Sequence, residues 1–178
     1  DVTFADGADI ITASAGTSNF RAGVNAGNSI ASGGNYNVAI GDEAGTAIST
    51  GDNSVAVGYA ALSSTTTSSS NTAVGKDSLR ANTTGTRNTA LGNASLEINT
   101  TGSDNVALGD FALYNNTTAS NNTAVGKDTL LSNTTGADNT AIGYVALDAN
   151  TTGQANVAVG ATSLTTNTTA SSNTAVGF

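Results

Sequence analysis

The chain has no cysteine, histidine, methionine, tryptophan or proline, and only eight of its 178 residues are aromatic. Without cysteine no disulfide can form, although this absence does not identify the compartment. Nucleophilic triads, zinc sites and most general acid–base pairs need histidine or cysteine. The sequence therefore argues against an enzyme, and we expect no cofactor and no catalytic or metal-binding residues.

Charge is also scarce. Charged residues make up 10% of the chain, against about 25% in an ordinary soluble domain. Thirteen acidic and five basic residues give a net charge of −8, and no Lys/Arg cluster occurs. Nucleic acid and anionic membranes are therefore poor partners. No apolar run approaches the roughly 20 residues of a membrane helix, and no signal peptide is visible. We expect no membrane insertion in this segment.

A strict repeat is what the sequence does have. Glycine recurs every seventeen residues and defines the glycine column, which comprises Gly41, Gly58, Gly75, Gly92, Gly109, Gly126, Gly143, Gly160 and Gly177. Alanine always stands two residues earlier, as in Ala73 and Ala90, and asparagine opens each block, as in Asn71 and Asn88, with Ser54 as the exception. Such a period is the signature of a repeat architecture.

Three further columns share the period. An aliphatic column directly precedes each glycine: Ile40, Val57, Val74, Leu91, Leu108, Val125, Ile142, Val159 and Val176. A leucine column follows each glycine by four residues: Leu62, Leu79, Leu96, Leu113, Leu130, Leu147 and Leu164, with Gly45 replacing leucine in the first clear block. A second asparagine, from Asn82 to Asn167, opens an Asn-Thr-Thr turn.

The repeat predicts an all-β fold, a parallel β-solenoid (β-roll) with 17-residue coils. Gly, Asn, Thr and Val are poor helix formers, whereas Asn-(Thr/Val)-Ala-(Val/Ile/Leu)-Gly alternates as a short strand does. A unit this short buries a face only when it stacks on identical neighbours. We expect asparagine to stack on asparagine as an amide ladder, and the aliphatic and leucine columns to form the core. Residues 1–35 would be degenerate N-terminal coils, and residues 36–178 regular repeats of a longer fibre.

A single thin roll buries few large side chains per coil, so we expect lateral self-association, most simply as a closed homotrimer. The blocks NVAIG at 37–41, NSVAVG at 53–58 and the later NTAVG resemble the NSVAIG-type repeats of trimeric autotransporter adhesin (YadA-like) heads. They also resemble repetitive NTAVG…AL…NTTG arrays of phage tail fibres and marine bacterial surface proteins. The resemblance covers residues 36–178. It implies a trimeric, left-handed roll on a cell surface or virion that attaches to a host glycan or protein.

Other chemistry is weakly supported by these residues. Paired carboxylates could cleave a glycan, but acidic side chains just after a column glycine are more typical of solvated turns; these are Asp42, Glu43, Asp77, Asp110 and Asp128. Calcium binding at Asp52, Asp104 or Asp138 lacks a regular acidic motif. The Asn-Thr-Thr turns formally match a glycosylation acceptor, but they recur because the turn recurs.

Two alternative binding roles for surface residues remain open. Tyr59, Tyr114 and Tyr144 could stack a sugar ring, although their columns are discontinuous. Threonines repeating at coil spacing could instead order water as an ice-binding face, and so could the Thr-x-Val pair if it points outward. The candidate ligand face comprises Thr83, Thr100, Thr117, Thr134 and Thr151. The sequence thus predicts an adhesive fibre segment, with an ice-binding solenoid as the alternative.

Overall fold

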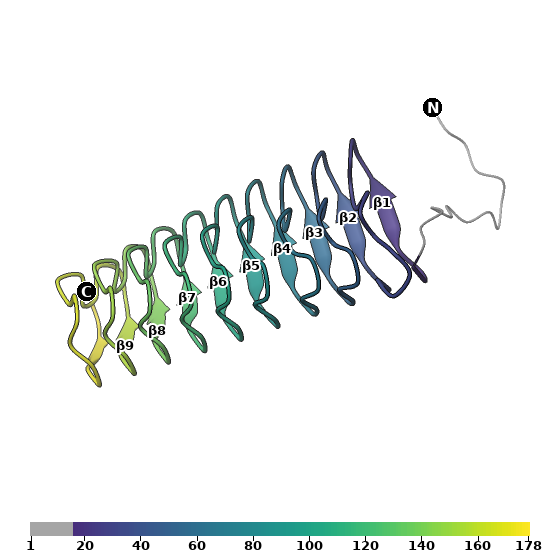
Figure 1. Cartoon of the computed structure of the whole chain (residues 1–178). Coiled ribbons are helices and arrows are strands. Elements are labelled where there is room, and N and C mark those ends of the chain that lie inside the picture. Colours follow the sequence, from purple (N-terminus) through teal and green to yellow (C-terminus); the bar gives the residue numbers. More distant parts are fainter. Residues whose placement is uncertain (1–15) are drawn as a thin grey trace, which may run out of the picture.

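A computed structural model describes residues 16–178, which form one continuous rod of stacked coils (Figure 1). The expected all-β parallel solenoid with 17-residue coils is confirmed. Each coil contributes one three-residue strand to a single ten-stranded sheet. In chain order the strands are β1 (Phe20–Ala22), β2 (Val38–Ile40), β3 (Val55–Val57), β4 (Thr72–Val74), β5 (Thr89–Leu91), β6 (Val106–Leu108), β7 (Thr123–Val125), β8 (Thr140–Ile142), β9 (Val157–Val159) and β10 (Thr174–Val176).

The sheet places equivalent residues of successive coils side by side. Strands β4 and β5 pair in parallel, with Ala73 opposite Ala90 and Val74 opposite Leu91. The offset is seventeen residues from β2 onward and eighteen between β1 and β2, where Phe20 pairs with Val38. Strand β1 thus lies in the segment expected to hold degenerate coils, while residues 1–15 of that segment lie outside the described residues.

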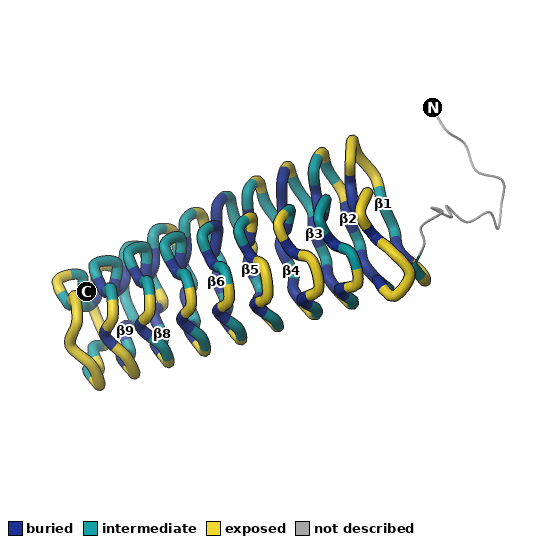
Figure 2. The backbone as a smooth tube through the Cα atoms, viewed as in Figure 1, coloured by how far each residue is buried: buried dark blue, intermediate teal, exposed yellow. Residues whose placement is uncertain are grey.

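The core is assembled from a different set of side chains than the sequence suggested. The alanine column from Ala39 to Ala158 is fully buried, and so is the leucine column from Leu62 to Leu147 (Figure 2). The aliphatic column is not in the core: Ile40, Leu91 and Ile142 are 37%, 39% and 40% exposed. Its assignment to the core was wrong, whereas that of the leucine column is confirmed. Successive strand residues point to opposite faces, so burying alanine sends the aliphatic neighbour outward.

Two amide ladders run through the buried interior beside the apolar columns. In the first, the backbone N–H of Asn105 donates to Oδ1 of Asn88 at 3.0 Å, and Nδ2 of Asn88 donates to the Gly102 carbonyl at 2.8 Å. In the second, Nδ2 of Asn116 donates to Oδ1 of Asn99 at 2.9 Å. These side chains have no exposed surface. Every rung satisfies polar groups that would otherwise be buried without partners.

In the first coils, isoleucine side chains fill the part of the core that leucine fills in later coils. Where later coils have leucine, this end has Gly27 and Gly45, and a Cβ built on either glycine would lie 2.9 Å from an isoleucine Cδ1, that of Ile30 or Ile48 respectively. Each isoleucine occupies the position of the later second asparagine and is buried. A large side chain thus fills the same space from a different backbone position, which preserves packing density.

Each coil holds several non-glycine residues in the left-handed backbone region. They stand two residues after the column glycine, in the leucine column, and directly before the opening asparagine, as Ala94 (φ 54°), Leu96 (φ 51°) and Ala155 (φ 53°) illustrate. Such a conformation costs an L-residue about 1–2 kcal/mol. The in-register stack therefore imposes a repeated backbone strain that glycine would relieve.

We expect Ala155→Gly to stabilise the solenoid by about 0.5 kcal/mol, since the relief of left-handed strain exceeds the entropy that glycine adds to the unfolded chain. Ala155 is exposed, so little packing is lost. The matched control is Ala137→Gly, one position earlier in its coil and without positive φ, which should lower stability. Chemical denaturation of both variants measures the difference. Equal destabilisation by the two would contradict the strain argument.

Candidate interaction surfaces

The outer sheet face is the first candidate surface. We define it as the first and third residues of strands β2 to β10, which point away from the core. The first position alternates irregularly between valine and threonine, and the third is the aliphatic column. The face carries no charged side chain, and its partly exposed methyl groups continue unbroken along the rod. Contiguous apolar surface of this kind marks an interaction site in soluble proteins.

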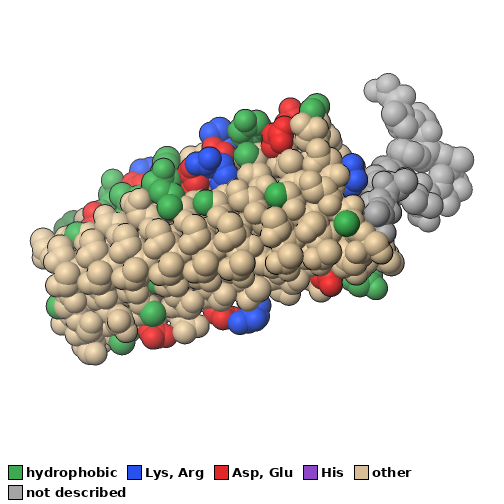
Figure 3. Space-filling model, in the orientation of Figure 1, with side chains coloured by type: hydrophobic (Ala, Val, Ile, Leu, Met, Phe, Trp, Pro, Cys, Tyr) green, Lys and Arg blue, Asp and Glu red, His purple; other side chains and the backbone are tan. Residues whose placement is uncertain are grey.

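The variable ridge is the second candidate surface, and we define it as the positions one, two and five residues after each column glycine from Gly41 to Gly160. These positions differ from coil to coil, whereas the glycine and alanine columns do not vary. Charged and apolar side chains gather most densely along the upper edge of the rod in Figure 3, fewer lie along the lower edge, and the broad face between the two edges carries few of them. The charged and aromatic members are Asp42, Glu43, Tyr59, Lys76, Asp77, Arg80, Glu97, Asp110, Phe111, Tyr114, Lys127, Asp128, Tyr144 and Asp148.

Every cation of the variable ridge is paired with a carboxylate. Lys76 bonds to Asp77 and Lys127 to Asp128, and these bonds raise the pKa of both ammonium groups. Arg80 bonds to Glu97 in the next coil, which raises the pKa of the guanidinium. The two ammonium groups also lie 6.0 Å from the Tyr59 ring centre and 5.9 Å from that of Tyr144. The remaining ridge charge is therefore negative.

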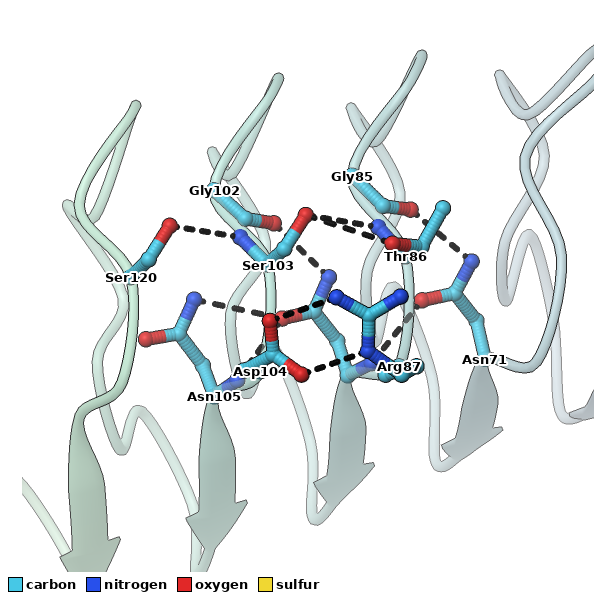
Figure 4. Close-up of polar contacts among 10 residues, drawn as sticks. Asn71, Gly85, Thr86, Arg87, Gly102, Ser103, Asp104, Asn105 and Ser120 are labelled. Carbon is cyan, nitrogen blue, oxygen red and sulfur yellow. Dashed lines mark hydrogen bonds and ion pairs between the residues drawn. The ribbon is translucent and has the colours of Figure 1, made fainter.

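A charged pair outside the ridge stands just before two of the opening asparagines (Figure 4). The Arg87 guanidinium donates to both carboxylate oxygens of Asp104 in the next coil, at 2.6 and 2.8 Å. This bond lowers the pKa of Asp104 and raises that of Arg87. Behind the pair, the backbone N–H of Thr86 donates to Oγ of Ser103 at 3.0 Å. Exposed pairs of this kind contribute little stability.

Asp148 is the ridge carboxylate with an uncompensated environment. Its Oδ1 is buried and has no hydrogen-bond partner within residues 16–178. Burial raises the pKa of Asp148, while the N–H of Ala149 and its own N–H act in the opposite direction. A raised folded-state pKa means that stability falls as pH rises from the unfolded value of about 3.9 through the folded value, and remains lower at neutral pH.

We therefore expect Asp148→Asn to raise the thermal midpoint at pH 7, and the gain to disappear below about pH 3, where both states are protonated. Melting curves at the two pH values measure this. Asp138→Asn, at an exposed carboxylate, controls for the change in net charge. A gain that persists in acid would contradict burial as its cause.

The threonines of the candidate ligand face are engaged in the stack. Each hydroxyl donates along the rod to the backbone carbonyl of its equivalent in the next coil: Thr83 to Thr100, Thr100 to Thr117, Thr117 to Thr134, Thr134 to Thr151 and Thr151 to Thr168, at 3.0 to 3.1 Å. Their donor hydrogens are thus directed at the protein. By contrast, the Thr-x-Val pairs of the strands lie on the outer sheet face.

The structure also places the residues that were considered for glycosylation, metal binding and carboxylate chemistry. The ladder asparagines that match glycosylation acceptors, Asn82 to Asn150, are fully buried. Within residues 16–178 no group of three or more acidic side chains could hold a metal ion. Asp42 and Asp110 each accept a backbone N–H from the preceding coil, at 3.0 and 3.1 Å. In the same part of the chain no helix is long and apolar enough to cross a membrane.

Searches against protein-family models, curated proteins and solved structures find no significant match to this chain. The class of protein is therefore defined by the fold, which is that of a β-solenoid repeat protein with one sheet and 17-residue coils.

Proposed function

We propose that this chain is a structural and adhesive segment of an extracellular fibre, on a cell surface or a virion. Three copies would associate in parallel through their outer sheet faces as left-handed rolls. The observation that supports this best is the uncharged aliphatic column, which is exposed or partly exposed along the whole sheet. Association would bury it, and in-register coils give each copy the same stripe to present to its neighbours. Because such a rod has many coils and three copies, many individually weak contacts to a host or matrix would act together, and their avidity would be sufficient for attachment.

The decisive experiment measures mass in solution by sedimentation. We expect a trimer, and we expect the double variant Leu91→Lys/Val125→Lys to be a folded monomer, because two charges per copy would have to be buried in the interface. The matched control Leu131→Lys places a lysine on the variable ridge and should remain trimeric. A monomeric unmodified protein would refute the proposed assembly.

A second candidate function is ice binding through the same outer sheet face. The Thr/Val-x-aliphatic pattern that faces outward supports it, since methyl and hydroxyl groups recur there at the inter-strand spacing of about 4.8 Å. This hypothesis expects a monomer with measurable thermal hysteresis. A trimer without hysteresis would reject it, and a monomer without hysteresis would reject both candidates.

A further inference from the structure

The coils contain two kinds of position, those that are constant from coil to coil and those that vary. The glycine column is constant because an added Cβ would meet the backbone of the next coil, and the constant alanine column lies fully buried in the core. The variable ridge changes at nearly every coil, although the backbone around it repeats. Coil stacking alone accepts alanine or serine at these places, as Ala60, Ala94 and Ser63 show. The large side chains of the ridge are therefore not required by the fold.

One coil of the ridge carries an aromatic platform. Phe111 and Tyr114 pack edge to face, with ring centres 5.7 Å apart and planes at 62°. Both are partly exposed. Among the described residues, lysine ammonium groups lie over Tyr59 and Tyr144, but none lies over these two rings. Mutual packing fixes their orientation, so a ligand that stacks on them would cost little side-chain entropy.

Polar groups and charge around this platform restrict its ligand. Asp110 adjoins Phe111 in the chain and uses one carboxylate oxygen to accept the Asn93 N–H. The neighbouring cations Lys127 and Arg80 are both paired with acids, while Asp110 and Asp148 have no ion-pair partner among the described residues. The excess charge is negative, which disfavours an anionic ligand. A matching ligand would therefore carry hydroxyl groups that donate to the carboxylates and weakly polar C–H faces that pack on the rings.

We propose that the Phe111–Tyr114 platform binds an uncharged polysaccharide laid along the variable ridge. One sugar ring stacks on one ring of the Phe111–Tyr114 pair, because planes at 62° cannot both lie flat against it, and its hydroxyls donate to Asp110 and the neighbouring ridge carboxylates. Successive coils are about 4.8 Å apart, so an extended chain whose sugars advance by a similar step would place successive sugars over successive coils. This inference gives a ligand class to the attachment role proposed above, and it uses a surface separate from the outer sheet face.

The test is a titration of the full chain with cellohexaose and, separately, with a hexamer of galacturonic acid, followed by NMR or calorimetry. We expect saturable binding of millimolar cellohexaose and at least tenfold weaker binding of the acidic hexamer. The double variant Phe111→Ala/Tyr114→Ser, whose new residues occur at equivalent places in other coils, should lose at least tenfold in affinity.

Tyr36→Ala, which removes an exposed aromatic outside the ridge, is the matched control and should bind as the unmodified chain does. The inference is overturned if cellohexaose does not bind, if the acidic hexamer binds as tightly, or if the double variant binds equally well. Sedimentation of the same samples keeps the outcomes distinct, because a trimer that fails to bind refutes only the ligand, and a monomer that binds refutes only the assembly.

Discussion

Gly92→Ala is expected to destabilise the solenoid by about 3–6 kcal/mol, through overpacking and backbone strain together. Gly92 has φ +137°, and a Cβ at this position would lie 2.5 Å from the carbonyl carbon and oxygen of Gly109. Those atoms are backbone, so the clash is relieved only if two coils separate. Since each coil contacts only its neighbours, the damage would interrupt the stack in its middle.

Gly177→Ala is the matched control because Gly177 belongs to the same column, with φ +130°, but an added Cβ there would have no atom of the described part of the chain within 4 Å. It should cost only the backbone strain, about 1–3 kcal/mol. Urea unfolding of the two variants measures both values, and a reduced m-value for Gly92→Ala would report local opening of the rod. Equal losses would show that close coil approach is not the reason for the glycine column.

The period of the sequence was sufficient to predict the stack, but not which face is inside. A three-residue strand puts its first and third side chains on one face and the second on the other, and either face could be buried. Hydrophobicity favoured the Val/Ile/Leu column, but the buried side chain is the middle one, which from Ala39 to Ala158 is the methyl group of an alanine. The constancy of alanine was the informative signal, because exposed positions of a repeat tolerate larger side chains.

Other features depend on distances that a linear pattern does not contain. To predict that Ile48 replaces the leucine missing at Gly45, one must know that the side chains at these two backbone positions point into the same space. The engagement of the Thr83 hydroxyl with the Thr100 carbonyl likewise follows from the turn geometry. The variable ridge could have been found from sequence, since aligning the coils shows where residues change, but the pairing of Phe111 with Tyr114 could not.

Asn105→Ala is expected to cost about 2–4 kcal/mol, because it interrupts a buried ladder at mid-rod. Oδ1 of Asn105 accepts the Asn122 N–H at 3.0 Å, and its Nδ2 donates to the Ala119 carbonyl at 2.9 Å. After truncation the buried Asn122 N–H loses its partner, which costs about 1–3 kcal/mol, and a small cavity adds to this. The Ala119 carbonyl keeps the bond from Asn116, so the loss comes mainly from one orphaned donor.

Two further substitutions separate hydrogen bonding from packing. Asn105→Ser should recover part of the loss, since Ser54 in the same column already accepts the Asn71 N–H at 3.3 Å through its hydroxyl. Asn105→Leu fills the space with a side chain also branched at Cγ but offers no acceptor, so it should be at least as damaging as alanine. Denaturant midpoints rank the three variants. If leucine restored stability while serine did not, the amide columns would be space-filling elements, and hydrogen bonding would not explain why asparagine recurs in every coil but one.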